Sequence, residues 1–217
     1  MPRAPAPELA AKKKTLHDSQ RDTPRVKRLR REFDTAVREG AGDLLDHLKF
    51  IDEFGVHLGL TRLFGRAAPG KRVVEGTPGY SGAHYTVVAA LSLQGIEAPW
   101  VFEGATSGNA FETYVEQVLA PTLTAGDLVL IDNLSAHKGD SISKLIEGCG
   151  ATLQFLPPYS PDWNPIELCW SKVKTALRRA KARTFDALVD ALCEALRAIN
   201  PADVLAWFAH CGYALDP

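Results

Sequence analysis

The chain has 217 residues, 46% of them hydrophobic and 24% charged, which is enough to bury the core of one domain and leave a short appendage. No apolar run approaches the roughly 18–20 residues of a membrane span, and residues 1–5 do not form the apolar core of a signal peptide. We therefore expect no membrane contact and a cytoplasmic location. The four cysteines contain no C-x-x-C pair and are expected to be reduced rather than to bind zinc: Cys149, Cys169, Cys193 and Cys211.

The formal net charge of −1 hides an uneven distribution along the chain. Residues 1–31 carry ten Lys or Arg and three acids, so this segment has a formal charge of +7 and the rest of the chain −8. A basic arm on an acidic body suits phosphate contact by the arm and cation binding by the body. A solvated charged leader also explains the same pattern.

Residues 1–22 are rich in Ala, Pro and Lys without periodicity, which predicts a linker or an arm without fixed structure of its own. Thr23 and Pro24 then supply an N-cap and a first-turn proline for a helix, which the Gly40-Ala41-Gly42 run stops. The apolar positions of this helix recur at helical spacing and leave a basic face: Val26, Leu29, Phe33 and Val37. We therefore divide the chain into a basic arm with one amphipathic helix, residues 1–46, and a main domain, residues 47–217.

The main domain is predicted to begin with an antiparallel meander of strands. Residues 47–52 and 56–64 form a predicted hairpin that turns at Gly55. Residues 85–93, rich in β-branched side chains, form a third predicted strand before a turn at Gln94-Gly95.

The elements after the meander are predicted to alternate as helix, strand, helix and strand: residues 110–119, 128–132, 140–147 and 152–156. The remainder is predicted to be helical, in three segments: residues 165–181, 185–199 and 201–210. Strands first and helices last are typical of the ribonuclease-H-like α/β fold, so we expect a mixed five-stranded sheet flanked by helices. In such a sheet the first strand and the strand ending at Asp132 lie parallel and side by side, with their acids at the same end.

Three carboxylates occupy positions that this fold would bring together. Asp52 and Asp132 each end an apolar strand, and Glu167 lies in the first turn of the helix predicted to cross that edge of the sheet. Two divalent ions about 3.5–4 Å apart need oxygen ligands and open substrate positions, which carboxylates supply. We therefore expect these three acids to be catalytic and to bind two Mg²⁺ or Mn²⁺ ions, both of which accept hard oxygen ligands.

Each acid also has a structural interpretation. An Asp at the end of a strand is often a turn residue, and Glu167 could complete a capping box with Asn164 as the N-cap. Asp162 is a rival third acid, but we expect it to shape the turn before the helix. Glu53 should face away from Asp52, because side chains alternate along a strand, and so should bond a neighbouring backbone or basic group instead of a metal.

Three short motifs follow one another along the main domain: Phe50-Ile51-Asp52-Glu53, Leu130-Ile131-Asp132-Asn133 with His137-Lys138, and Leu156-Pro157-Pro158-Tyr159-Ser160-Pro161-Asp162-Trp163-Asn164-Pro165-Ile166-Glu167. Their order resembles that of the DDE transposases of the mariner-like insertion-sequence superfamily. The 34 residues between Asp132 and Glu167 match a spacing typical of that superfamily. The resemblance covers roughly residues 47–212.

The resemblance implies a Mg²⁺-dependent nuclease and strand transferase that excises an insertion element at its terminal inverted repeats and joins it to target DNA. It also implies a homodimer that bridges two element ends, and a TA dinucleotide as target. Members of this family usually carry helix-turn-helix domains ahead of the catalytic domain, and residues 1–46 are too few to hold them. We therefore expect sequence-specific recognition to reside in an upstream helix-turn-helix domain or protein.

Residues near the acids are candidates for DNA contact or support. Lys174 and Arg178 share one stripe of the predicted helix with Glu167 and could contact phosphates beside the cut. A solvated stripe is the competing interpretation. Lys138 is a further candidate phosphate contact, and Asn133 and His137 are possible supporting residues, although a lone His after a strand is more often structural.

Two rival functions remain open at this point. The same fold and acids are found in integrases and ribonuclease-H-like nucleases, for which cleavage of RNA–DNA hybrids without strand joining would be diagnostic. An inactive transposase remnant that binds DNA or a partner through its basic arm is the alternative outside enzymes.

Overall fold

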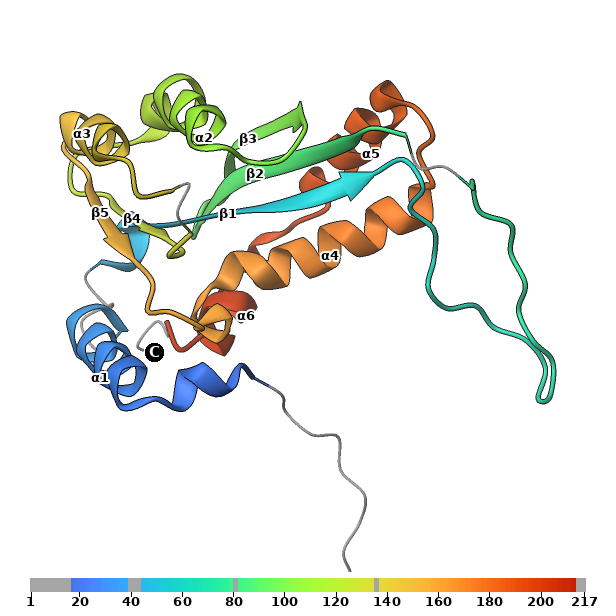
Figure 1. Cartoon of the computed structure of the whole chain (residues 1–217), viewed down its shortest axis with the longest axis horizontal. Helices are drawn as coiled ribbons and strands as arrows, with labels where there is room; N and C mark the ends of the chain where they lie inside the picture. Colours follow the sequence, from blue (N-terminus) through green and yellow to red (C-terminus); the bar gives the residue numbers. More distant parts are fainter. Residues whose placement is uncertain (1–16, 39–43, 80–81, 135–136, 214–217) are drawn as a thin grey trace, which may run out of the picture.

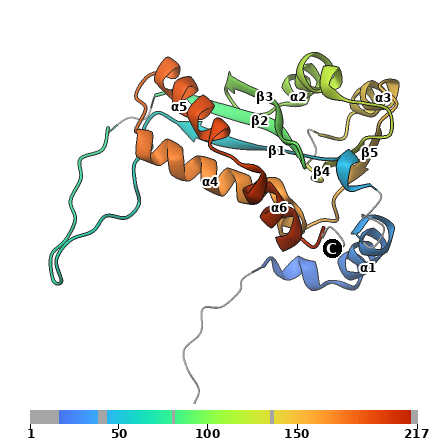
Figure 2. The same ribbon diagram turned by 180° about the vertical axis from the view of Figure 1, so that it is seen from behind.

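The computed structural model describes residues 17–38, 44–79, 82–134 and 137–213. The strands are β1 (Leu48–His57), β2 (His84–Ser92), β3 (Gly95–Glu103), β4 (Leu128–Ile131) and β5 (Thr152–Phe155). The α-helices are α1 (Pro24–Phe33), α2 (Gly108–Tyr114), α3 (Asp140–Gly148), α4 (Pro165–Ala180), α5 (Phe185–Arg197) and α6 (Pro201–His210). Helices α4, α5 and α6 cover one face of the sheet and α2 and α3 cover the other (Figures 1 and 2).

The five strands form one mixed sheet in the order β3-β2-β1-β4-β5. Strands β1, β2 and β3 pair antiparallel in chain order, whereas β4 pairs parallel with both β1 and β5. The predicted mixed five-stranded sheet of the ribonuclease-H-like fold is therefore confirmed. It does open with an antiparallel meander, but two of the three strands of that meander differ from the predicted ones. The register that matters for the site pairs Ile51 of β1 with Ile131 of β4, so the residues that follow these two are neighbours.

The predicted hairpin at Gly55 is wrong. Strand β1 runs straight through Gly55, which pairs with Thr86 of β2, and the ladder continues to the pair His57 and His84. A side chain at Gly55 would meet nothing within 4 Å, so this glycine neither forces a turn nor fills a tight space. The described residues between β1 and β2 contain no helix or strand and form the long excursion that extends from the sheet in Figure 1.

Strand β3 was missed by the sequence analysis, which predicted only the turn before it. The strand contains Pro99 and a left-handed Ala98, with φ of 50°, beside an irregularity in the pairing of β2. Proline is tolerated here because β3 is an edge strand, where one row of backbone groups needs no partner.

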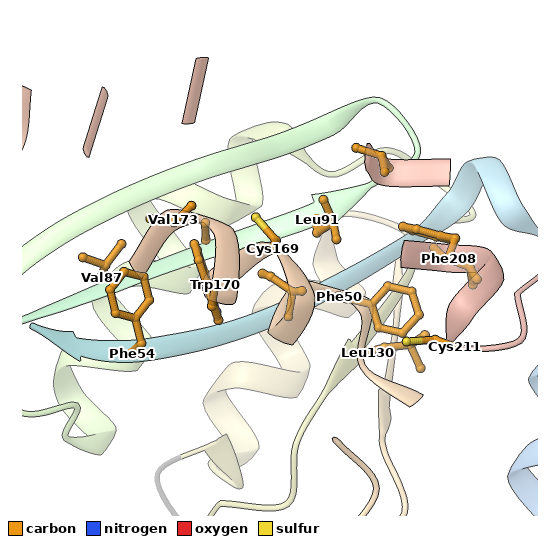
Figure 3. Packing of buried hydrophobic residues seen from close by; sticks show 14 of the residues in the cluster. Phe50, Phe54, Val87, Leu91, Leu130, Cys169, Trp170, Val173, Phe208 and Cys211 are labelled. Carbon is orange, nitrogen blue, oxygen red and sulfur yellow. The ribbon is translucent and has the colours of Figure 1, made fainter. Parts of the chain in front are cut away.

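The sheet separates two apolar cores, and alternate residues of β1 supply both. Phe50 and Phe54 face α4, where Trp170 packs with its ring centroid 4.8 Å from that of Phe54 (Figure 3). Ile51 faces the opposite core, which α2 and α3 complete with residues such as Phe111. Full burial of one such aromatic or aliphatic side chain contributes about 1.5–3 kcal/mol. The two cores therefore fix which way each residue of β1 points.

Helix α1 is joined to the main domain by its apolar face. Val26 and Phe33 of α1 are buried, as is Val37 in the helical turn that follows it at Asp34–Arg38. Phe33 and Val37 belong to the same core cluster as Phe50. The chain also forms a short 3-10 turn at Ser19–Asp22, where no fixed structure was expected. The rest of the predicted arm, residues 1–16, and the glycine run at residues 40–42 lie outside the described residues.

No α-helix of the described segments is both long and apolar enough to cross a membrane. All four cysteines are free, as expected; Cys169 and Cys211 are buried and Cys193 is exposed. Burial raises the pKa of the Cys169 thiol to about 12, so this side chain is an uncharged core residue at neutral pH.

Candidate active site

The parallel pairing of β1 and β4 brings Asp52 and Asp132 together. Ile51 and Ile131 are paired and lie in the same core cluster, so the next residue of each strand points to the opposite face. That face is the one covered by α4. Asp52 is buried at 9% exposure in the middle of β1, at the point where β4 ends and Asp132 begins the following loop.

The third acid, Glu167, enters from the first turn of α4. Asn164 is extended and precedes Pro165, which fixes the start of the helix. The side chain of Asn164 makes no capping hydrogen bond, so the capping-box interpretation of Glu167 does not hold. Glu167 is exposed, and its carboxylate is free to face the cleft.

The three acids line one cleft of about 790 Å³. Its floor is formed by the middle of β1 and by the residues that follow β4 and β5. Its wall includes residues of the segment that contains α1: Gln20, Thr23, Arg25 and Val26. Lys138 and Asn133, predicted respectively as a phosphate contact and a supporting residue, also line it. No sequence pattern indicates that residues 20–26 reach this cleft, because their approach depends on tertiary packing alone.

The electrostatics of the cleft reflect uncompensated negative charge. Burial, followed by the nearby charges of Glu167, Glu53 and Asp132, raises the pKa of Asp52 to about 8. The Asp52 carboxyl therefore keeps its proton at neutral pH unless a cation enters the cleft.

His137 links Asp132 to the acid on the other side of β1. Its Nδ1 lies 2.7 Å from Asp132 Oδ1 and its Nε2 lies 3.3 Å from Glu53 Oε2. The ring is almost fully buried, with its centroid 4.2 Å from that of Phe111. Burial alone would lower the pKa of His137, but hydrogen bonding to Asp132 and the charge of Glu53 raise it to about 9. His137 is therefore a buried cation that orients Asp132, and its contact with Glu53 is an ion pair.

Asp162, the rival third acid, is held by arginines. Arg30 donates to both of its oxygens, at 3.1 and 2.8 Å, and Arg21 donates to Oδ2 at 3.0 Å. Although burial alone would raise the pKa of Asp162, the hydrogen bonds and charge of Arg30 lower it. This carboxylate is turned toward α1 and not toward Asp52, which leaves Glu167 as the third acid of the cleft.

Asn133 supports the floor of the cleft, because its side-chain amide donates to the carbonyl of Leu156 and ties the end of β4 to the end of β5. Lys174 lies on α4 with its ammonium 4.9 Å from the ring centroid of Phe54, a cation–π contact. Arg178 lies one turn further along α4 and about 16 Å from Glu167, at 1.5 Å per residue. Both cations therefore lie on the helix predicted for them.

Arg178 lines a second cavity of about 700 Å³ between α4 and the excursion that follows β1. Arg62, Arg66 and Arg179 line it too, beside the exposed ring of Phe64. None of these arginines has an ion-pair partner within the described ranges. The cavity is therefore a positively charged groove on the same side of α4 as the stripe from Glu167 to Arg178.

The acids fit a divalent cation by chemistry, although they do not already enclose one. No three His, Cys, Asp or Glu side chains in the described part of the chain are arranged as a ready metal cluster. Asp132 Oδ1 is instead occupied by His137 and by the backbone N–H of Leu134, at 3.0 Å. The raised pKa of Asp52 indicates a place where positive charge would be stabilising.

Comparisons with known proteins agree with the geometry. Residues 47–189 match the family described as DDE superfamily endonuclease. The Mos1 strand transfer complex is similar in fold, with a TM-score of 0.72 and 13% identity over 94% of this chain and 63% of that one. The pre-cleavage Mos1 transpososome gives a TM-score of 0.68 and 12% identity over 95% and 64%, respectively.

The catalytic domain of Mos1 mariner transposase gives a TM-score of 0.63 at 11% identity, over 92% of this chain and 91% of that domain. This chain therefore spans less than two thirds of the chains in the transpososome and the strand transfer complex, but nearly all of the isolated catalytic domain. No curated protein sequence matches the chain.

Proposed function

This chain belongs to the DDE superfamily endonucleases, and from that premise we propose that it is the catalytic part of a transposase. It would cut DNA at the ends of an insertion element and join those ends to target DNA. The observation that carries the proposal is the convergence of Asp52, Asp132 and Glu167 on one cleft from three separate elements. A turn residue or a helix cap would need no such convergence.

The three carboxylates would hold two divalent ions, Mg²⁺ or Mn²⁺. When bound, such ions activate water or a 3′-hydroxyl for in-line attack on a phosphodiester and stabilise the leaving oxygen. The matched Mos1 structures include paired-end complexes with Mg and with Mn, which supports this choice of ion. Carboxylate oxygens are ligands that both ions accept.

The residues of the chain have separate tasks in this proposal. Asp52 has to lose its proton for its carboxylate to bind a cation. Because the pKa of Asp52 is raised to about 8, this loss becomes easier as pH increases toward that value. His137 keeps Asp132 in one orientation through its ring nitrogen. Glu167, which makes no side-chain hydrogen bond within the described ranges, is free to complete the ligand set.

DNA would enter along the cations beside the acids. Lys138 lies on the cleft itself, and Lys174 and Arg178 follow Glu167 along α4. Arginine and lysine at such positions contact phosphates and fix the position of the duplex without reading its sequence. The arginine groove beside Arg178 continues the same positively charged path.

Sequence recognition would reside in an upstream helix-turn-helix domain or protein. We also propose that two copies of the chain act as a homodimer on two element ends, in the cytoplasm of a prokaryotic cell. The paired-end and strand transfer complexes formed by Mos1 support the assignment of transposon-end DNA as the partner.

The test is cleavage and strand transfer on labelled duplexes that carry the inverted repeats flanking the coding sequence. The chain alone and the chain fused to its upstream helix-turn-helix segment would be compared in Mg²⁺ and in Mn²⁺. We expect cleavage and joining by the fusion and loss of both on Asp132→Ala, by at least about a thousandfold, since electrostatic stabilisation of this kind is the largest catalytic term.

Activity that survives Asp132→Ala would contradict the metal-carboxylate mechanism. Cleavage of RNA–DNA hybrids without strand joining would instead favour a ribonuclease-H-like nuclease. Inactivity of both wild-type proteins on every substrate would favour a remnant that binds DNA without cutting it.

A further inference from the structure

The turn that precedes α4 determines where Glu167 stands. Residues 156–164 connect β5 to α4, and Trp163 ends a short 3-10 turn just before the N-cap of α4. The ring of Trp163 is stacked on Phe33 of α1, with the centroids 5.7 Å apart. Its position is therefore set by a helix that precedes the first strand.

The guanidinium group of Arg30, on α1, contacts this turn both by stacking and by hydrogen bonds. It lies 3.6 Å from the ring centroid of Trp163, where cation–π attraction is strong, and only 11% of its side chain is exposed. It also donates to the hydroxyl of Ser160 and to both oxygens of Asp162. One side chain thus contacts three of the four residues 160–163.

Other contacts fix the same turn from independent directions. The hydroxyl of Tyr213 donates to the carbonyl of Trp163 at 2.9 Å. Tyr159, which has a left-handed φ of 57°, donates from its own hydroxyl to Gln20 at 2.7 Å. A residue kept in that region of backbone space needs surroundings that over-determine it, and residues 20–30 supply much of those surroundings.

We propose that Arg30 is a positioning residue for the active site. By holding the turn at residues 160–163, it fixes the start of α4 and hence the carboxylate of Glu167 relative to Asp52 and Asp132. The inference rests on the proposed function, because it assigns Glu167 a metal-binding role. It makes α1, which lies outside the family match at residues 47–189, a working part of the catalytic unit.

The chemistry of the contact requires arginine. The planar guanidinium can stack on Trp163 and still form parallel hydrogen bonds to Asp162, whereas an ammonium can do only one of these well. Arg30→Lys should therefore keep the charge and the fold but lose part of the positioning. Arg31→Gln is a matched control, because Arg31 is the exposed neighbour on the same helix and has no ion-pair partner within the described ranges.

The experiment compares wild type, Arg30→Gln, Arg30→Lys and Arg31→Gln in the full chain. Mn²⁺ binding is followed by the electron paramagnetic resonance signal of free Mn²⁺, and hydrogen exchange is measured for peptides covering residues 159–167. We expect Mn²⁺ affinity to fall about tenfold in Arg30→Gln, a loss typical of residues that support metal ligands, and less in Arg30→Lys. Exchange over residues 159–167 should accelerate in the same order, and Arg31→Gln should match wild type in both measurements.

Unchanged Mn²⁺ affinity in Arg30→Gln and Arg30→Lys, even with a lowered Tm, would overturn the proposal, because a purely structural contact predicts that result. Should Arg30→Gln fail to fold, Arg30→Lys and Asp162→Asn carry the same comparison. If wild type itself does not bind Mn²⁺, the proposed function fails, while the exchange rates still decide whether Arg30 holds the turn: wild-type rates in both Arg30 variants would overturn that part as well.

Discussion

Replacing Asp52 by asparagine should stabilise the metal-free protein, even though it removes a proposed catalytic residue. Burial and the neighbouring acids raise the pKa of Asp52 from 3.8 to about 8. Between these two values the native state keeps a proton that the unfolded state has lost, so the folding stability that Asp52 contributes falls as pH rises. The full penalty is reached above about pH 8 and is absent below the unfolded pKa.

The size of this effect follows from the interval between the two pKa values. At about 1.4 kcal/mol per pH unit, the ceiling is about 6 kcal/mol. We expect Asp52→Asn to be more stable than wild type by only about 2 kcal/mol at high pH. The gain is smaller than the ceiling because the amide must itself be buried and because the coupled acids relax. The advantage of the variant should be small near pH 4 and grow steadily toward pH 9.

Urea unfolding followed by tryptophan fluorescence, with chelator present, measures this difference across the pH range. Excess Mn²⁺ should reverse the order, because an ion that binds only the native wild type stabilises it by mass action. An Asp52→Asn protein that is less stable than wild type at every pH, or whose advantage does not grow with pH, would refute the reasoning about converging charge.

Two further predictions concern neighbours of the acids. His137→Gln should lose about 2 kcal/mol of stability at neutral pH, because a buried ion pair is broken. Since the pKa of His137 is raised to about 9, this loss should have its full size below pH 6.5 and disappear as pH rises through 9. Urea unfolding at several pH values checks it, and a loss independent of pH would count against a charged His137. Lys174→Gln combined with Arg178→Gln should weaken duplex binding without changing Mn²⁺ affinity. The slope of log affinity against log salt concentration should become shallower by the amount expected for about two lost phosphate contacts. Fluorescence anisotropy at several salt concentrations measures this slope, and a slope equal to that of wild type would remove both residues from the DNA path.

The sequence was sufficient to predict the acids of the cleft because their neighbourhood follows from local rules. Asp52 and Asp132 each follow an apolar run, and parallel pairing of these two runs places the two acids side by side, even though β1 continues beyond Asp52. Asn164 and Pro165 likewise mark the start of α4, which places Glu167 in its first turn.

The supporting contacts could not be predicted, since each joins residues far apart in the chain. Arg30 and Asp162 are 132 residues apart, and no pattern in either segment identifies the other. His137 was expected only as a possible supporting residue, because its bridge to Glu53 depends on how the loop after β4 folds back over β1.

The two wrong strand predictions, the turn at Gly55 and the missed β3, also arise from contacts between residues far apart in the chain. Gly55 looks like a turn residue locally, yet its pairing with Thr86 keeps β1 extended beyond it. Strand β3 contains Pro99, which disfavours a strand locally and is acceptable only because the strand lies at the edge of the sheet. Local propensity was overridden in both places by tertiary pairing.

The most direct test of the central claim is metal-dependent cleavage of element-end DNA by Glu167→Gln. Glu147→Gln, an exposed acid on α3, is the matched control for the same change of charge. The account predicts that Glu167→Gln binds the duplex as wild type does but does not cut it in Mg²⁺ or Mn²⁺, while Glu147→Gln cuts normally. Normal cleavage by Glu167→Gln would contradict the assignment of these three acids as one catalytic site.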